Sequence, residues 1–105
     1  MQNKLLSNLG LAHRARKLVT GTEGVRNSIK DHSALLVLVA EDASNNTKKE
    51  VSDSAHYYNA EVRIINFTMA ELASALGKLH NVACVAITDI GFKTLVNNSL
   101  ENQEV

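Results

Sequence analysis

Apolar residues follow two spacings along this chain, one helical and one typical of buried strands. Apolar positions three and four residues apart predict a first helix over residues 2–16. Continuous apolar runs at 34–40 and 82–88 are typical of strands that are covered on both faces of a sheet. Two shorter runs, 17–20 and 62–65, complete a set of four predicted strands.

Helix starts are predicted by threonine and glutamate placed three residues apart. In a capping box the threonine side chain accepts a hydrogen bond from the glutamate N–H, and the glutamate side chain accepts one in return. Thr20 with Glu23 fits this pattern, and Thr68 with Glu71 fits it again. Gly77 follows the second of these helices and is placed to end it as a left-handed cap.

Two further helices are predicted after the buried strands. Asp42 or Ser44 is placed to cap one of them, and Asp89 begins the other. Residues from Asn98 onward are polar, so we expect 98–105 to form a frayed tail. The inward faces of the second to fifth helices are predicted to be Val25, Ser28 and Ile29; Val51, Ala55 and Tyr58; Met69, Leu72, Ala73 and Leu76; and Phe92, Leu95 and Val96.

The order of elements is αβαβαβαβα. Helices that alternate with continuous apolar strands indicate a sheet covered on both faces. We therefore predict an α/β fold, a three-layer α/β/α sandwich with a four-stranded mixed sheet. The chain has no proline and no linker-like segment, so residues 1–105 are expected to form a single domain.

The composition predicts an aliphatic core and indicates a reducing compartment. Only four of the 105 residues are Phe or Tyr and none is Trp, so the core must be built from Leu, Val, Ile and Ala. Cys84 is the single cysteine, which excludes an intrachain disulfide and suits the cytosol. The longest apolar run is far shorter than the roughly 20 residues of a membrane span. We expect a cytoplasmic protein that does not contact membrane and is a monomer.

The net charge is zero, but the charges are divided between two parts of the chain. Residues 1–30 hold six basic residues against one acidic residue, a net charge of +5, and residues 31–105 carry −5. Such a division can place one basic face on an acidic body, as nucleic-acid binding requires. The alternative is that these charges are ordinary solvated surface.

The residues do not indicate an active site. The four histidines form no metal-ligand spacing, and Cys84 lies among apolar strand residues, as a buried structural thiol does. The adjacent carboxylates Glu41 and Asp42 suit helix capping better than acid–base chemistry. Catalytic residues, metal ligands and cofactors are therefore not expected. The turn at 21–24 has glycine at both ends and is able to offer backbone N–H groups to a phosphate.

Several stretches together resemble the kink-turn-binding ribosomal protein family, and most closely its bacterial YlxQ-like branch. The resemblance covers about residues 4–96. It is carried by Leu9-Gly10-Leu11-Ala12-His13-Arg14-Ala15-Arg16-Lys17-Leu18-Val19-Thr20-Gly21, by Leu35 to Ser44, by Asn45-Asn46-Thr47-Lys48-Lys49, and by Leu76-Gly77-Lys78 through Ala86-Ile87-Thr88-Asp89. It implies an α/β/α sandwich, no catalysis, and binding to structured RNA, particularly to kink-turns.

The resemblance also implies two RNA contacts. One is the start of the second helix, where the family pattern is Gly, a small residue, Asn, Glu, two variable positions and Lys. Gly21 and Thr22 match, whereas Glu23, Gly24 and Asn27 replace the Asn, Glu and Lys. The other is the loop at 77–81, where apolar side chains touch a flipped-out nucleotide. The RNA-binding residues are thus expected to be Arg14, Arg16, Lys17, Gly21, Thr22, Glu23, Arg26, Asn27, Lys30, Lys78, Leu79 and His80.

Two functions remain open from the sequence. The first is a ribosome-associated protein that recognises structured, kink-turn-like RNA. The second is a protein-interaction module that keeps the fold but has lost specific kink-turn reading, which the three replaced residues motivate. An acidic residue wedged among the basic ones would favour the second. For the loop at 77–81, the alternative is a plain helix-to-strand loop with an exposed leucine.

Overall fold

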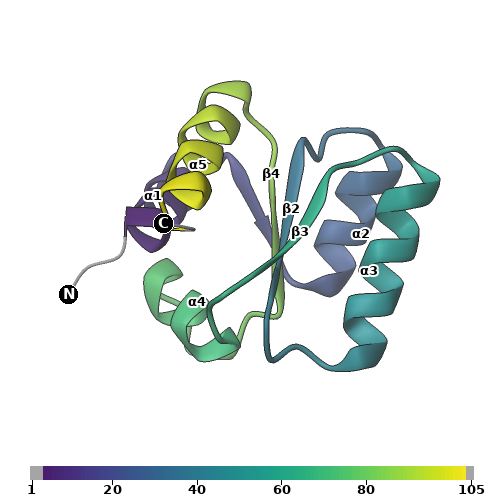
Figure 1. Cartoon of the computed structure of the whole chain (residues 1–105), viewed down its shortest axis with the longest axis horizontal. Coiled ribbons are helices and arrows are strands. Elements are labelled where there is room, and N and C mark those ends of the chain that lie inside the picture. Colours follow the sequence, from purple (N-terminus) through teal and green to yellow (C-terminus); the bar gives the residue numbers. More distant parts are fainter. Residues whose placement is uncertain (1–3, 104–105) are drawn as a thin grey trace.

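The computed structural model describes residues 4–103, with side chains to residue 100. Five helices and four strands alternate along this part of the chain (Figure 1). Their bounds are α1 Lys4–Arg14, β1 Leu18–Thr20, α2 Thr22–Lys30, β2 Leu36–Ala40, α3 Asn45–Tyr57, β3 Val62–Ile65, α4 Met69–Leu76, β4 Cys84–Ile87 and α5 Ile90–Gln103. The order is the predicted one.

The strands form one mixed sheet with the order β1-β4-β2-β3. β4 pairs antiparallel with both β1 and β2, and β2 pairs parallel with β3. β1, β2 and β3 therefore all point the same way and end at one edge of the sheet, where β4 begins. The predicted four-stranded mixed sheet is confirmed.

Helices cover both faces of the sheet, as predicted for a three-layer sandwich. Figure 1 shows α1, α4 and α5 on one side and α2 with α3 on the other. All residues of β2 and β4 are buried, because each strand contributes alternate side chains to the two apolar cores. The buried apolar residues are aliphatic apart from Cys84. Among the described helices, none is long and apolar enough to cross a membrane.

Several predicted element ends are displaced. The first helix ends at Arg14 rather than at residue 16, since Arg16 adopts a left-handed conformation with φ of 61°. The start of that prediction, residues 2–3, lies outside the described residues. The two buried strands are each shorter than their apolar runs, because a residue such as Ala34 is buried in the loop before β2 without pairing in the sheet.

One of the two capping boxes is confirmed and the other is wrong. Thr68 accepts a hydrogen bond from the Glu71 N–H, and Glu71 accepts one from the Thr68 N–H. Thr20 instead ends strand β1, where it pairs with Val85, so it is not free to cap α2. The residue before α2 is Gly21, which has no side chain with which to cap it.

Of the two residues predicted to cap α3, Asp42 and Ser44, the structure selects Ser44. Ser44 caps α3, since its hydroxyl accepts a hydrogen bond from the Thr47 N–H at 3.1 Å. Asp42 does not cap α3. Its carboxylate accepts a hydrogen bond from the Met69 N–H, at the start of α4, at 2.8 Å. Asp89 starts α5 as predicted, because its carboxylate accepts from the Phe92 N–H.

The prediction of a frayed C-terminal tail is wrong for the described residues. α5 continues to Gln103, and Ser99 and Leu100 are buried. The Nδ2 group of buried Asn8 donates to the Ser99 hydroxyl at 2.6 Å, which ties α5 to α1. Polar residues in this segment therefore serve a helix–helix contact. Leu95, predicted to face inward, is 39% exposed; residues 104–105 lie outside the described chain.

Gly10 lets α1 and α4 approach closely. A Cβ atom at this position would lie 2.9 Å from the backbone oxygen of Ala75. We predict that Gly10→Ala lowers the free energy of unfolding by about 1 kcal/mol, since overpacking outweighs the gain in helix propensity. Thermal and urea unfolding monitored by circular dichroism will measure this loss. Ser74→Ala, at an exposed position of α4, is the control; a Gly10→Ala protein as stable as this control contradicts the close approach.

Candidate nucleic-acid interface

Three turns meet at the edge of the sheet where β1, β2 and β3 end. The Gly21 N–H, after β1, donates to the Cys84 carbonyl at 3.0 Å. The Ala40 N–H, at the end of β2, donates to the Ala83 carbonyl at 2.8 Å. These bonds place the start of α2, the β2–α3 turn and the loop after α4 side by side, at the lower end of the molecule in Figure 1.

The N-terminus of α2 offers free backbone donors at this edge. Gly21 has φ of 89° and ψ of 154°, a conformation open essentially to glycine alone. Its carbonyl accepts from the Val25 N–H, which closes the first turn. The N–H groups of Thr22, Glu23 and Gly24 find no acceptor among the described residues. Uncapped N–H groups at a helix start form a site with positive potential, suited to an anion.

Gly24 is explained by the packing of α2 on β1. A Cβ atom at Gly24 would lie 2.9 Å from the Cγ1 atom of Val19, a residue of the neighbouring strand. α2 therefore begins in close contact with the edge strand β1, and a side chain at position 24 would push the helix away from that strand. Glu23 is exposed on the same turn. Its carboxylate lies one helical turn from Arg26, on the side of α2 that faces solvent.

The loop at 77–81 stands beside this turn and is anchored to α4 at both ends. Gly77 ends α4 in a left-handed conformation with φ of 69°. The Lys78 N–H donates to the Ala73 carbonyl at 2.9 Å, and the Val82 N–H donates to the Met69 carbonyl at 3.3 Å. Leu79 is 97% exposed between these anchors. The predicted residues Lys78, Leu79 and His80 are thus all at the surface.

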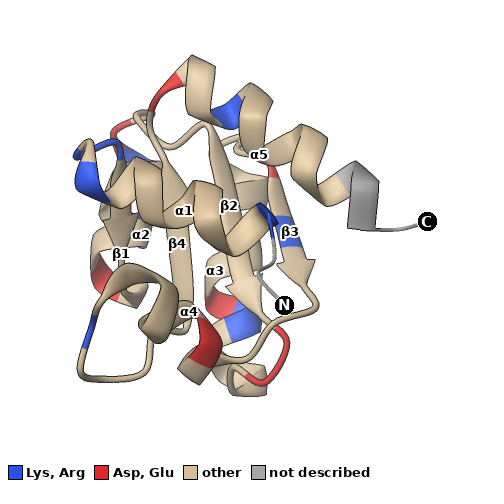
Figure 2. Ribbon diagram, turned by 90° about the vertical axis from the view of Figure 1, so that its left-hand side faces the viewer, with Lys and Arg blue, Asp and Glu red and all other residues tan. Residues whose placement is uncertain are grey.

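The basic residues do not all lie at this edge. Arg14, Arg16 and Lys17 are exposed around the turn that leads into β1, and the Lys17 carbonyl accepts from the Thr88 N–H at the far end of β4. Figure 2 shows Lys and Arg segments where α1 ends and β1 begins, and another in the loop after α4. Strand β1 spans the distance between them, about 10 Å for its three residues.

α2 connects the two ends of the interface. Arg26, Asn27 and Lys30 are exposed along this helix, which starts beside the 77–81 loop and returns toward the end of the sheet where β1 begins. Arg26 and Lys30 are four residues apart and share a face, as predicted. The structure thus groups Gly21, Thr22 and Glu23 with Lys78, Leu79 and His80, and extends this group along α2 toward Arg14, Arg16 and Lys17.

Sequence reasoning missed the β2–α3 turn, residues 41–44, which lies at the same edge. The order of the elements contains the signal, because parallel strands followed by helices bring their carboxyl ends to one edge. The sequence does not give the order and directions of the strands, and without them the β2–α3 turn cannot be placed beside the start of α2. Antiparallel pairing of β1 with β4, and of β4 with β2, makes β1 and β2 parallel.

Cys84 lies directly beneath the α2 turn and is fully buried. Burial raises the pKa of its thiol above the ordinary value, against a smaller opposing effect of a hydrogen bond with the Thr22 side chain. A thiol with a raised pKa is a poor nucleophile. The prediction of a structural cysteine is confirmed.

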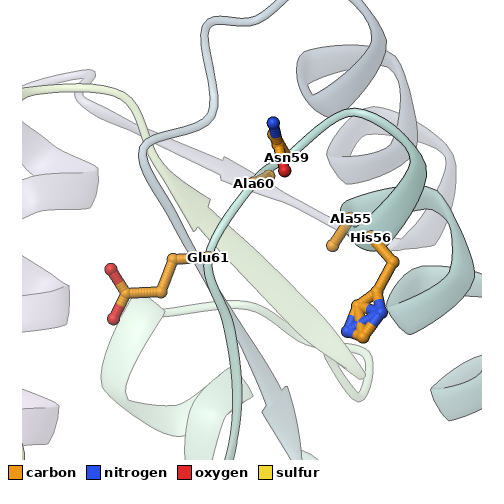
Figure 3. Close-up of a pocket in the computed structure, with 5 residues that line it drawn as sticks. All are labelled: Ala55, His56, Asn59, Ala60 and Glu61. Atoms are coloured by element: carbon orange, nitrogen blue, oxygen red, sulfur yellow. The ribbon is translucent and has the colours of Figure 1, made fainter.

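The described residues show no convergent catalytic or metal-binding groups. No cluster of three His, Cys, Asp or Glu side chains in the described part of the chain is placed to hold a metal ion. A shallow hollow is lined by Ala55, His56, Asn59, Ala60 and Glu61. Figure 3 shows the Glu61 side chain extending away from His56, so the two side chains do not converge on a common ligand atom.

Comparison with known proteins gives close relatives. The RNA-binding protein YlxQ of Bacillus subtilis is 45% identical over 84 residues, 80% of this chain and 82% of its own length. YlxQ of Enterococcus faecium is 38% identical over 100 residues, 95% of this chain and 94% of its own. A large ribosomal subunit protein eL30 of Spodoptera frugiperda is 28% identical over 97 residues, which cover 92% of this chain and 86% of that protein.

Solved structures show the same fold. A Bacillus halodurans protein described as having unknown function superposes with a TM-score of 0.87 at 33% identity, covering 95% of this chain and 99% of that one. A Giardia lamblia 15.5 kD RNA-binding protein has a TM-score of 0.77 at 14% identity, covering 96% and 85%, and supports the fold alone.

The sequence pattern of the ribosomal protein L7Ae/L30e/S12e/Gadd45 family matches residues 3–97, nearly the whole described chain. This match and the YlxQ relatives confirm the resemblance and its bacterial branch. They also bear out the expectation that the chain is not an enzyme, since the family is one of ribosomal-type proteins. The chain therefore belongs to the ribosomal protein L7Ae/L30e/S12e/Gadd45 family.

Proposed function

We propose that this chain binds structured RNA through the edge of the sheet where α2 begins. The carrying observation is the uncapped start of α2, whose free N–H groups at Thr22, Glu23 and Gly24 lie beside the exposed 77–81 loop. Such N–H groups are suited to phosphates and to acceptor atoms on base edges. The two YlxQ relatives, named as RNA-binding proteins, support the same function.

The basic residues supply the attraction to the phosphate backbone. Arg26 and Lys30 follow the exposed face of α2, and Arg14, Arg16 and Lys17 lie at the far end of β1. RNA that touches both the α2 start and this basic end must extend along the edge strand. A sharply bent RNA such as a kink-turn offers both a base-paired region, for the α2 start, and an unstacked nucleotide of the kind that proteins bind, for the 77–81 loop. We propose a kink-turn-like RNA on these grounds, and association with the ribosome because the chain is also similar to a protein named as large ribosomal subunit protein eL30.

Glu23 and Gly24 set the expected specificity. A carboxylate at position 23 accepts hydrogen bonds but does not donate, and Gly24 offers no side chain to a base. Since a bidentate base contact contributes about 1–3 kcal/mol of discrimination, losing one weakens the preference for a particular base pair. We therefore propose that shape and backbone contacts contribute more to this interface than base-edge contacts.

Arg26 allows the contribution of charge to be measured. Arg26→Ala is expected to weaken binding to a kink-turn RNA and to lower the slope of log affinity against log salt by about 1, because one phosphate contact is lost. Fluorescence anisotropy over a salt series, with the kink-turn and a plain duplex of equal length, measures both. Lys93→Ala on α5 is the control, since Lys93 pairs with Glu61 at the end of the sheet where β3 begins, opposite to this edge.

The binding experiment tests RNA binding and kink-turn preference separately. If the wild-type protein shows no affinity for either RNA at low salt, the RNA-binding proposal is wrong. Equal affinity for kink-turn and duplex removes the kink-turn proposal alone.

Leu79 allows the contribution of the 77–81 loop to be measured. Because its side chain is 97% exposed, Leu79→Ala leaves the free energy of unfolding unchanged. If Leu79 covers an unstacked base, its removal weakens kink-turn binding roughly fivefold, for about 1 kcal/mol of lost apolar burial. Ile64→Ala is the matched control, since Ile64 is a 56% exposed apolar residue on β3, at the opposite side of the sheet. Equal binding by both variants contradicts the role of the loop.

Glu23 favours a second candidate, a protein partner. Its carboxylate is exposed among the N–H groups of α2 and near Arg26, where it repels phosphate. For RNA binding, Glu23→Gln is expected to raise affinity at low salt, and the effect must fade as salt increases. If neither the wild type nor Glu23→Gln binds RNA, the RNA-binding proposal is wrong and the protein-interaction module is the candidate function to test next.

A further inference from the structure

Asp42 connects the β2–α3 turn to the helix that carries the 77–81 loop. Its carboxylate oxygen Oδ1 accepts the Met69 N–H at 2.8 Å, across 27 positions of sequence. We propose that Asp42 is a positioning residue for RNA binding, which holds the 77–81 loop in place through Met69. This inference rests on the proposed RNA contact of that loop.

α4 does not need Asp42 in order to start. The capping box already provides acceptors for the N–H group of Glu71 in the first turn and for that of Thr68, the N-cap residue. The Asp42 carboxylate takes a third N–H, that of Met69, from a different part of the chain. The bond therefore fixes where α4 lies relative to the β2–α3 turn.

Met69 transmits this position to the loop. Its N–H donates to Asp42, while its carbonyl accepts from the Val82 N–H at 3.3 Å, at the end of the loop. The other end of the loop is anchored on the same helix, where Lys78 donates to Ala73. The Met69 side chain packs against the apolar cores on both faces of the sheet. A shift of α4 therefore moves both anchors of the loop together.

A backbone bond supports the same junction. The Glu41 N–H donates to the Phe67 carbonyl at 3.0 Å, so the residues before Asp42 and before Met69 are also joined. This bond survives side-chain substitution at Asp42. Removing the carboxylate is thus expected to loosen α4 locally without separating the two segments or unfolding the chain.

Charge and position predict opposite effects at Asp42. An exposed carboxylate at an RNA-binding edge repels phosphate, so its removal alone raises RNA affinity. If the carboxylate acts through Met69, its removal lowers affinity instead. Glu41 offers the matched control, because it is an exposed carboxylate one residue away for whose side chain the described chain shows no hydrogen bond or ion pair.

The test uses Asp42→Ala, Asp42→Asn and Glu41→Ala in the full chain, with a kink-turn RNA and a plain duplex as probes. We expect Asp42→Ala to weaken kink-turn binding by about threefold to tenfold, the range of a lost cap bond. Asp42→Asn keeps an oxygen acceptor and has lost the charge, so it is expected to bind at least as tightly as wild type. Glu41→Ala is expected to bind as tightly or more tightly.

A double-mutant cycle with Leu79→Ala then separates a positioning role from a general loss of stability. If Asp42 acts through the loop, Asp42→Ala has little further effect once Leu79 is removed. Asp42→Ala binding as tightly as Glu41→Ala, or an additive cycle, overturns the inference. A wild-type chain that binds neither RNA overturns the proposed function itself, and Leu79→Ala binding as wild type removes the contact on which the inference rests.

Discussion

The two central strands, β2 and β4, are buried on both faces, and this burial fixes the arrangement of the other elements. Each strand feeds alternate side chains into two aliphatic cores, so a slip of one residue would exchange the two sets. Antiparallel pairing of β2 with β4 then determines where the edge strands belong. β1 pairs along the other side of β4, and β3 along the other side of β2.

This pairing also decides where backbone donors are available. Strands β1, β2 and β3 end at the same edge, and each leads into a helix that starts there. Ser44 caps α3, while Thr68, Glu71 and Asp42 serve α4. α2 starts from Gly21, which has no side chain, so its N–H groups remain available to a ligand. The location of the proposed interface therefore follows from the topology together with Gly21, which cannot cap α2.

The sequence predicts the elements and layers well, because these depend on apolar spacing within a single segment. It fails where one segment supplies a partner to another. Thr20 and Glu23 have the spacing of a capping box, but the pairing of Thr20 with Val85 removes the threonine. Asp42 has the right place to cap α3, yet it reaches α4. The polar C-terminal residues suggest a frayed tail, but Ser99 is buried because Asn8, 91 positions away, donates a hydrogen bond to its hydroxyl.

The candidate site, too, was predictable from the sequence only in part. The family resemblance indicated the start of α2 and the 77–81 loop as two separate contacts, and the structure adds that the Gly21 N–H donates to the Cys84 carbonyl, on the strand that follows this loop. The charge division in the sequence predicts that one basic face is possible, but it does not predict that Arg14, Arg16 and Lys17 lie at the opposite end of β1 from the α2 start. Charge counts carry no information on strand direction, which determines this separation.

The position of Cys84 gives the protein an intrinsic reporter. It is the single cysteine in the sequence, and its buried thiol lies under the turn that begins α2. A reagent reaches this sulfur only when that end of the sheet opens, so the rate of thiol labelling measures the free energy of a local opening. The same fold therefore allows the dynamics of one edge to be followed without introducing a label or altering a residue.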